Sequence, residues 1–289
     1  MIRTLAAALA LVLFATASPA QDLARQALTL VNEARAEQGL NPLALSPPLM
    51  EAARAHAEDM ARRDYHAHVS PSGRTLRDRF RAAGGRRGQL IAENIAMCEG
   101  CGGADRARVD GFQSGWMQSP GHRENILRRG IDSFGFAMAS RGRAVYAVQT
   151  FAGPGRSRGA ANDVDPTPIS PDEAADRLLA QHDGDLEPAA ALDQVARSVA
   201  GAVELEGEEL AGIPNDLFSL LPEGGGGWTG LSVRVAACEA CGAEVTEPDV
   251  PWFAGELAPE DAAGFSHAGF ALDAEGDGRK VGVAVYGTR

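Results

Sequence analysis

The chain has 289 residues, enough for one large domain or two of ordinary size, each with its own core. Its net charge of −12 is unevenly divided. Residues 1–157 hold 20 Arg against 14 Asp and Glu, which gives +6, and residues 158–289 hold 7 Lys and Arg against 25 Asp and Glu, which gives −18. The arginines are scattered and lack interleaved aromatic residues, which argues against a nucleic-acid partner. We expect the acidic half to keep the chain soluble and to pair with the basic half within one molecule.

Residues 1–20 predict a secretory signal peptide. Arg3 precedes a largely apolar run, and Ser18-Pro19-Ala20 offers a small-residue cleavage site before Gln21. The apolar run is shorter than the ~20 residues of a transmembrane helix, and no second run of this kind follows. We therefore expect a secreted or periplasmic protein, cleaved near Ala20 and without a transmembrane anchor.

Two amphipathic helices are predicted next. Apolar residues recur at helical spacing from Leu23 to Ala34, and that pattern ends at Gly39. The second helix starts with Ser46 as its cap and Pro47 in its first turn, and its apolar face extends to Met60. His56 lies on this face and is interpreted as a core residue.

Three strands follow the two helices. Residues 90–97 read as one strand, and residues 134–138 and 144–151 read as a hairpin. Helices segregated from an antiparallel sheet indicate an α+β fold. Residues 153–172 are rich in Gly, Pro, Ser and Asp without periodicity, which predicts a linker between a domain at 21–152 and a second at 173–289.

The second part of the chain echoes the first in the same order. The matched segments are Cys98/Cys101 with Cys238/Cys241, Gly135-Phe136-Ala137 with Gly269-Phe270-Ala271, Trp116 with Trp252, and the opening helices with residues 174–200. This order predicts an internal duplication, with chance agreement of Ala- and Gly-rich strings as the alternative. Val233 falls opposite Glu93, and no Gly-His-Arg segment follows Trp252, so the second copy reads as a degenerate repeat.

His68, Glu93 and His122 are the candidate metal ligands. Two imidazoles and a carboxylate suit Zn²⁺ or a similar divalent ion with an open position for water. Glu93 stands in an apolar strand, where a buried carboxylate needs a cation or hydrogen-bond donors. The alternative for both histidines is a structural role, in which their rings cap turns or form hydrogen bonds with carbonyl groups. His66 is expected to face solvent.

His122 is presented by a short predicted helix. Ser119 can cap it, Pro120 fits its first position, and Gly130 follows it as a stop signal. Asn125 is expected to brace this turn, and Gln149 either lines a ligand groove or satisfies backbone groups. Ser119, Asn125 and Gln149 are therefore the candidate groove residues.

The four cysteines form two Cys-x-x-Cys pairs. In an exported protein each pair is expected to close its own short disulfide, Cys98 with Cys101 and Cys238 with Cys241. The alternative is one structural Zn²⁺ held by all four thiolates. A thioredoxin-like role is disfavoured because neither pair opens a helix after a parallel strand.

These motifs together resemble the bacterial branch of the CAP superfamily, which contains cysteine-rich secretory, antigen 5 and pathogenesis-related proteins and whose domain is also called SCP. The matching pieces are His68 to Gly73 with Arg79, Glu93 to Ala96, Trp116 to Leu127, and Tyr146 to Phe151. The resemblance covers roughly residues 23–152. It implies an α-β-α sandwich whose central groove holds His68, Glu93 and His122.

Three functions are open at this point. The first is an exported binding module whose groove takes a divalent metal, zinc in the first place, and a small-molecule, lipid or cell-envelope ligand. The second is a metal-assisted hydrolase of peptide or cell-wall bonds, in which Glu93 activates water. The third is a purely structural surface protein.

Overall fold

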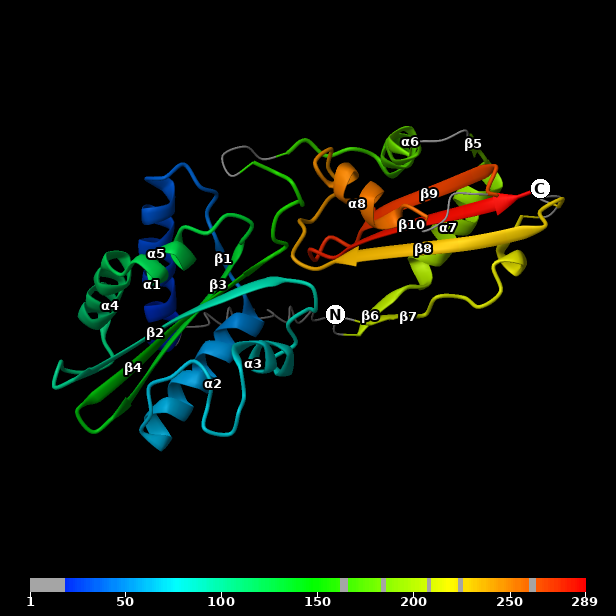
Figure 1. The fold of residues 1–289 in the computed structure, drawn as a ribbon. Coiled ribbons are helices and arrows are strands. Elements are labelled where there is room, and N and C mark those ends of the chain that lie inside the picture. The colour runs from blue at the N-terminus through cyan, green and yellow to red at the C-terminus, as the bar shows by residue number, and fades with distance from the viewer. Residues whose placement is uncertain (1–18, 162–165, 183–185, 207–208, 223–225, 260–263) are drawn as a thin grey trace, which may run out of the picture.

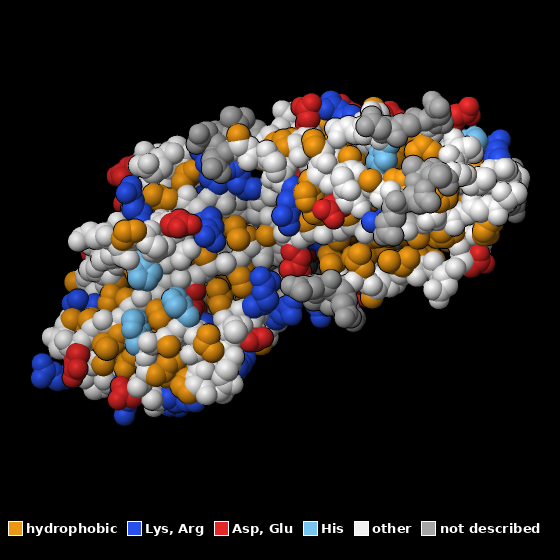
Figure 2. Space-filling view, viewed as in Figure 1, with side chains coloured by type: hydrophobic (Ala, Val, Ile, Leu, Met, Phe, Trp, Pro, Cys, Tyr) orange, Lys and Arg blue, Asp and Glu red, His pale blue; other side chains and the backbone are white. Residues whose placement is uncertain are grey.

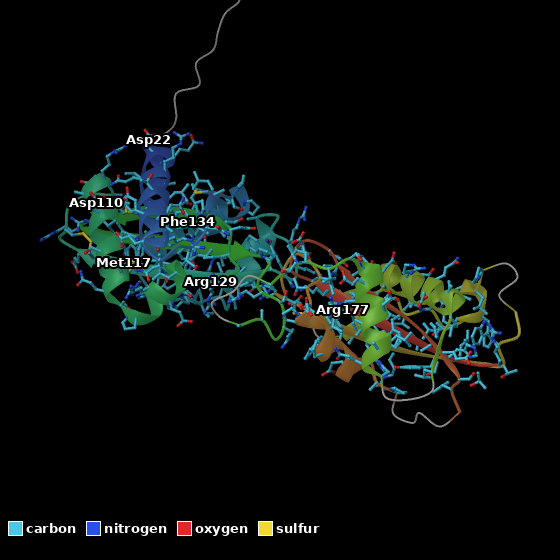
Figure 3. All side chains as sticks on the ribbon, turned by 90° about the horizontal axis from the view of Figure 1, so that it is seen from above. Asp22, Asp110, Met117, Arg129, Phe134 and Arg177 are labelled. Atoms are coloured by element: carbon cyan, nitrogen blue, oxygen red, sulfur yellow. A yellow bond between two sulfur atoms is a disulfide. The ribbon has the colours of Figure 1, made fainter. Side chains whose placement is uncertain are left out.

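The structure is a computed structural model that describes residues 19–161, 166–182, 186–206, 209–222, 226–259 and 264–289. Two α-β-α sandwiches lie end to end (Figures 1 and 3), and we call them the N-terminal sandwich, residues 19–153, and the C-terminal sandwich, residues 171–288. The predicted α+β fold is confirmed. The predicted signal peptide lies outside the described residues except for Pro19 and Ala20, which begin the first helix.

The N-terminal sandwich has one four-stranded sheet between two helical layers. Its elements are α1 (Pro19–Ala36), β1 (Ala44–Leu45), α2 (Pro47–Arg63), α3 (Leu76–Ala82), β2 (Leu90–Glu99), α4 (Arg106–Gln118), α5 (Pro120–Ile126), β3 (Ser133–Arg141) and β4 (Ala144–Gly153). The strand order is β1-β3-β4-β2, so β2 is an edge strand. Helices α1, α4 and α5 lie on one face of the sheet, and α2 and α3 lie on the other (Figure 1).

Alternation along β4 builds both cores of this sandwich. Val145, Ala147 and Phe151 pack into the cluster on the α1 and α4 side, whereas Tyr146 and Val148 pack against α2. Successive side chains of a strand point to opposite faces, so a strand covered on both sides is apolar along most of its length. This explains why residues 144–151 were recognisable as a strand.

Three elements of this sandwich were not predicted. β1 has 2 residues and exists through its parallel pairing with β3, where Ala44 lies opposite Ser133. α3 begins with a capping box between Thr75 and Asp78. α4 contains Gly111 and Gly115, which weaken its local helical signal, and it is stabilised by burying residues such as Trp116.

The C-terminal sandwich repeats this plan. Its elements are α6 (Pro171–Gln181), β5 (Glu187–Pro188), α7 (Ala190–Ala202), β6 (Glu204–Glu206), β7 (Glu209–Ala211), the short 3-10 helix η1 (Phe218–Leu220), β8 (Gly230–Cys238), α8 (Asp249–Leu257), β9 (His267–Ala274) and β10 (Lys280–Thr288). Its four-stranded sheet has the order β5-β9-β10-β8. In both sheets the short first strand runs parallel to its neighbour and the other pairs are antiparallel.

The glycines of the two Gly-Phe-Ala segments have the same role. A Cβ on Gly135 would lie 2.3 Å from the Leu49 carbonyl carbon in the first turn of α2, and a Cβ on Gly269 would lie 2.2 Å from the Asp193 nitrogen in the first turn of α7. Each glycine therefore lets a helix approach its strand closely. This supports the proposed duplication.

The proposed Trp116 and Trp252 correspondence does not extend to their environments. Trp116 is buried at the end of α4 and donates from Nε1 to the Ile95 carbonyl at 3.2 Å. Trp252 is half-buried in the first turn of α8, under the guanidinium of Arg158. The two tryptophans occupy comparable helices but support them differently.

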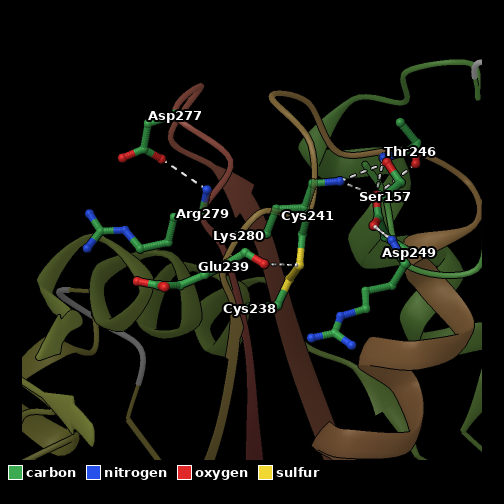
Figure 4. The surroundings of a disulfide bond; sticks show 10 residues. Ser157, Cys238, Glu239, Cys241, Thr246, Asp249, Asp277, Arg279 and Lys280 are labelled. Carbon is green, nitrogen blue, oxygen red and sulfur yellow. Dashed lines mark hydrogen bonds and ion pairs between the residues drawn. A yellow bond between two sulfur atoms is a disulfide. The ribbon is translucent and has the colours of Figure 1, made fainter. Parts of the chain in front are cut away.

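Backbone hydrogen bonds join the sandwiches at the Cys238–Cys241 loop. Figure 4 shows the surroundings of this disulfide, with Ser157, Asp249 and Lys280 nearby. The Ala240 nitrogen donates to Gly88 in the N-terminal sandwich at 2.7 Å, and the Ala240 oxygen accepts from Arg156 at 3.0 Å. Nearby, Lys280 is fully buried and donates to Asp249 at 2.6 Å and to Ser157 at 3.0 Å. Part of the predicted linker is thus anchored to the C-terminal sandwich, and the division into domains at 153–172 remains a proposal.

Candidate functional site

The candidate site surrounds β2, at the edge of the N-terminal sheet. Glu93 and Asn94 are consecutive residues of this strand, so their side chains point to opposite faces. Glu93 meets residues of α2, α3 and the loop between them, whereas Asn94 meets α5 and β4. The site therefore joins both helical layers around an edge strand.

Glu93 is held by a cation and an imidazole. Its side chain is 3% exposed, and its Oε2 accepts from Arg79 Nη2 at 2.8 Å. Its Oε1 lies 2.9 Å from His68 Nδ1 and 3.8 Å from His56 Nε2. The cation that a buried carboxylate requires is thus Arg79.

Arg79 also fixes the loop that carries His68. The guanidinium is 5% exposed, and it donates to the His68 carbonyl at 3.2 Å and to the Arg74 carbonyl at 3.1 Å. One buried side chain therefore binds both the carboxylate of Glu93 and the backbone beside His68. This explains how a loop residue is positioned with defined geometry.

His122 is fixed from the other helical layer. Its Nδ1 lies 2.9 Å from Ser119 Oγ, and its carbonyl accepts from Asn94 Nδ2 at 3.1 Å. Ser119 occupies the N-cap position of α5, but its side chain makes no capping bond. The predicted helix is present, and its Ser119 holds the imidazole instead of the helix end.

The imidazoles of His66, His68 and His122 share one surface, which we call the imidazole surface. Burial lowers the pKa of His122, and positive charge on His68 and His66 lowers it further. Burial lowers the pKa of His66 also, and again His68 contributes. Figure 2 shows histidine side chains gathered on one face of the N-terminal sandwich. His66, predicted to face solvent, is exposed and belongs to this group.

A chain of side-chain amides, three buried and one half-buried, lies beneath this surface. Gln149 Nε2 donates to Gln113 Oε1 at 2.8 Å, and Asn94 Nδ2 donates to Gln149 Oε1 at 3.2 Å. Asn125 Nδ2 donates to Asn94 Oδ1 at 3.0 Å and to the Glu93 carbonyl at 3.3 Å. Hydrogen bonds of this kind fix the elements that they join, and within the described residues the chain of amides ends at Gln113, whose Nε2 has no hydrogen-bond partner.

The structure corrects the interpretation of Gln149 as a groove residue and adds Gln113 and Arg79 to the residues of the site. Gln149 is fully buried, so it supports the site from below and does not line an open groove. Asn125 braces the turn at His122, as expected. Gln113 was not predicted, although a polar residue on the face that carries Phe112 and Trp116 was a recognisable signal. Arg79 was included only through the resemblance.

His56 is a core residue, as predicted, and it lies close to the candidate site. It is fully buried, and its Nε2 contacts the Ala67 carbonyl at 3.0 Å. Among the residues that the structure describes, no group of three or more His, Cys, Asp or Glu side chains is arranged to hold a metal ion. The three-ligand set of His68, Glu93 and His122 remains a hypothesis.

Both Cys-x-x-Cys pairs form local disulfides, Cys98 with Cys101 and Cys238 with Cys241. Cys98 lies at the far end of β2, eight residues from Leu90 and the junction side. At ~3.3 Å per residue this is a separation on the order of 26 Å, too great for a zinc ion shared by all four thiolates.

None of the helices in the described ranges combines the length and the apolar character that a bilayer crossing requires.

The cysteine-rich secretory protein family, CAP, matches residues 28–151. The chain is 30% identical over 118 residues to the uncharacterized protein YkwD of Bacillus subtilis, a match that covers 41% of this chain and 43% of that protein. It is 34% identical over 129 residues to the uncharacterized membrane protein YlbC of the same organism, covering 44% of this chain and 33% of that one. The chain therefore spans less than half the length of these relatives.

Among solved structures, an extracellular protein containing an SCP domain from Bacillus anthracis is 28% identical, with a TM-score of 0.37 and coverage of 46% of this chain and 40% of that chain. The matched segment contains β2, α5 and every residue of the candidate site. Residues 28–151 of this chain are a CAP domain of the cysteine-rich secretory protein family.

Proposed function

We propose that the N-terminal sandwich is an exported ligand-binding module, in which the imidazoles of His68 and His122 hold a divalent metal ion, zinc in the first place. One observation carries the proposal. Nδ1 of each ring is engaged, by Glu93 Oε1 at 2.9 Å and by Ser119 Oγ at 2.9 Å, so Nε2 of each ring is the nitrogen left for a ligand. Metal-binding imidazoles are commonly oriented in this way.

Glu93 fits an orienting role better than that of a ligand. Both of its oxygens accept hydrogen bonds, from His68 and from Arg79, and the side chain is 3% exposed. A carboxylate so placed fixes the tautomer of His68 and raises the basicity of its free nitrogen. The proposed site therefore has two protein ligands, and water or the bound molecule completes the coordination. Two imidazoles alone bind zinc weakly.

The proposed ligand is a small or extended molecule of the cell envelope, including lipids. The imidazole surface is open on one face, and His68 is 55% exposed, so a ligand can reach Nε2 without rearrangement of the core. Export is supported by the sequence of residues 1–20 and by the CAP domain itself. A related solved protein is described as extracellular.

Hydrolysis is less well supported. A general base must reach the proton that it abstracts, and its charge must be available. Glu93 is buried and neutralised by Arg79, so it meets neither condition in this arrangement. Binding is therefore the function that the geometry favours.

The experiment is zinc titration of the mature protein, followed by calorimetry and elemental analysis. We expect one zinc ion per chain in the wild type and none in His68→Ala/His122→Ala. His66→Ala is the matched control and should keep the ion, while Glu93→Gln should weaken binding by about 10–100-fold. Zinc retained in the double variant would place the ion elsewhere and refute the site.

A further inference from the structure

A second polar site lies at Arg79, and its lining does not include His66, His68 or His122. A cavity of about 240 Å³ separates α2 from the loop 70–74 that precedes α3, and Arg79 is among its lining residues. Figure 1 shows α3 and this loop beside α2. The volume is several times the ~30 Å³ that one water occupies in the liquid, so the cavity has room for a small ligand.

Arg79 has an unused donor at this place. Its Nη1 and Nη2 are bonded to carbonyl groups and to Glu93, but within the described part of the chain its buried Nε has no hydrogen-bond partner. Roughly nine in ten or more buried polar groups are satisfied in native proteins, and a bound water or ion is one explanation of an exception. Arg79 is 5% exposed, so bulk solvent does not supply this partner freely.

The lining of the cavity favours a negative ligand. Five arginines line it, Arg54, Arg62, Arg63, Arg74 and Arg79, against two carboxylates, Glu58 and Asp59. Both carboxylates are already engaged, because Glu58 accepts from Arg54 at 2.8 Å and Asp59 pairs with Arg62 and Arg63. Arg74 is exposed and makes no salt bridge with any described residue. Arg54 also pairs with Glu51, and Arg79 pairs with Glu93, so Arg74 is the arginine whose charge leaves the lining positive.

Hydroxyl groups add neutral donors. Ser70 Oγ accepts from the Arg74 nitrogen at 3.0 Å and lies 3.0 Å from Ser72 Oγ. When Ser70 donates to Ser72, the hydroxyl proton of Ser72 is free for a ligand. Ser70 is buried, whereas Ser72 and Arg74 lie at the mouth of the cavity. Guanidinium and hydroxyl donors around a small cavity match the several acceptor oxygens of a tetrahedral oxyanion.

We propose that this cavity binds a phosphate or sulfate group, with Arg79, Ser72 and Arg74 as its donors. Arg79 then contacts the oxyanion on one side and Glu93 on the other, so the same guanidinium belongs to both sites. The bound group accepts a hydrogen bond from Arg79 Nε, the buried donor that has no partner among the described residues.

The test is calorimetric titration of the full mature chain with inorganic phosphate, inorganic sulfate and glycerol phosphate at constant ionic strength. We expect saturable binding of at least one of them. Binding of glycerol phosphate as tightly as inorganic phosphate assigns the site to a terminal group of a larger molecule, whereas preference for the inorganic ion assigns it to a free oxyanion.

Matched variants locate the site. Arg74→Gln removes one charge-assisted donor and should weaken binding by roughly tenfold, and Ser72→Ala should weaken it less. Arg81→Gln makes the same charge change on the exposed part of α3, outside the cavity lining, and should bind like the wild type. His122→Ala should also leave oxyanion binding unchanged, which separates this site from the imidazole surface. Absence of saturable binding, or equal weakening by Arg74→Gln and Arg81→Gln, would overturn the proposal.

Discussion

The buried pair of Arg79 and Glu93 gives the most decisive test of the site. Their side chains are 5% and 3% exposed and lie 2.8 Å apart. Glu93→Gln preserves shape but leaves a buried guanidinium without a counter-charge. Removal of one partner of a buried pair costs about 3–5 kcal/mol of unfolding free energy. We expect a loss in this range for Glu93→Gln and a similar loss for Arg79→Met.

The double variant Arg79→Met/Glu93→Leu leaves no isolated charge, so its cost should be well below the sum of the single costs. The matched control is Arg54→Met. Arg54 pairs with Glu51 at 2.6 Å and with Glu58 at 2.8 Å, but it is 53% exposed, and such surface pairs contribute about 1 kcal/mol or less.

The assay is urea unfolding followed by hydrogen exchange of the β2 amides, because two sandwiches need not unfold as one unit. Addition of salt should weaken the Arg54 pair and leave the Arg79 pair unchanged, since buried charges are screened less. A cost below about 1 kcal/mol for Glu93→Gln, or strict additivity in the double variant, would refute the assignment of a buried, coupled pair.

Three further predictions concern packing, the junction and pH. Gly135→Ala and Gly269→Ala should each destabilise the chain by about 1–3 kcal/mol, because the new Cβ would lie 2.3 and 2.2 Å from helix backbone atoms. Gly115→Ala is the control, since its Cβ would have nothing within 4 Å, and it should be neutral or stabilising. Thermal unfolding compares the three variants. Cys238→Ala/Cys241→Ala should increase hydrogen exchange at the amides of Ala240 and Arg156, which donate to Gly88 and to Ala240 respectively. Cys98→Ala/Cys101→Ala should leave these amides protected. Burial lowers the pKa of His56, an effect that Glu93 partly offsets and Arg79 adds to, so below about pH 6.5 the unfolded chain binds more protons and stability falls as the pH falls. His56→Gln should flatten the decline in urea midpoint between neutral and mildly acidic pH; an unchanged slope would exclude His56 as its source.

The elements that the sequence predicts well are those whose local pattern agrees with their burial. α2 has a proline start and a continuous apolar face, and β4 is apolar along most of its length, with Gln149 and Thr150 as its buried polar residues. α4 was missed because its glycines weaken the local pattern, and it is stabilised by tertiary contacts such as those of Trp116. β1 has no signal of its own, because two residues become a strand only beside β3.

The need for a positive partner beside Glu93 could be predicted from the sequence, but the residue that supplies it could not. A carboxylate in an apolar strand requires a positive partner, and this requirement holds for Glu93. The partner, Arg79, lies on a short helix that no periodicity revealed, and it reaches Glu93 only because α3 packs beside β2. The metal hypothesis was based on residue types, while the engagement of each Nδ1 depends on rotamers that a sequence does not encode locally.

The C-terminal sandwich provides an independent argument about this pair. In the N-terminal sheet Glu93, Thr150 and Gly135 form one row across three strands. The corresponding row in the C-terminal sheet is Val233, Val285 and Gly269, so two sequence matches with different offsets meet in one register.

Val233 therefore stands at the position of Glu93, and between α7 and β8 the chain forms β6, β7 and η1 in place of a helix like α3. Among the residues described in that segment, neither the carboxylate nor the guanidinium of the buried pair has a counterpart. Loss of one half alone would leave an uncompensated buried charge, whereas loss of both can be nearly neutral. On the proposed duplication, loss of the carboxylate together with its guanidinium is the change that leaves no uncompensated buried charge in the second copy.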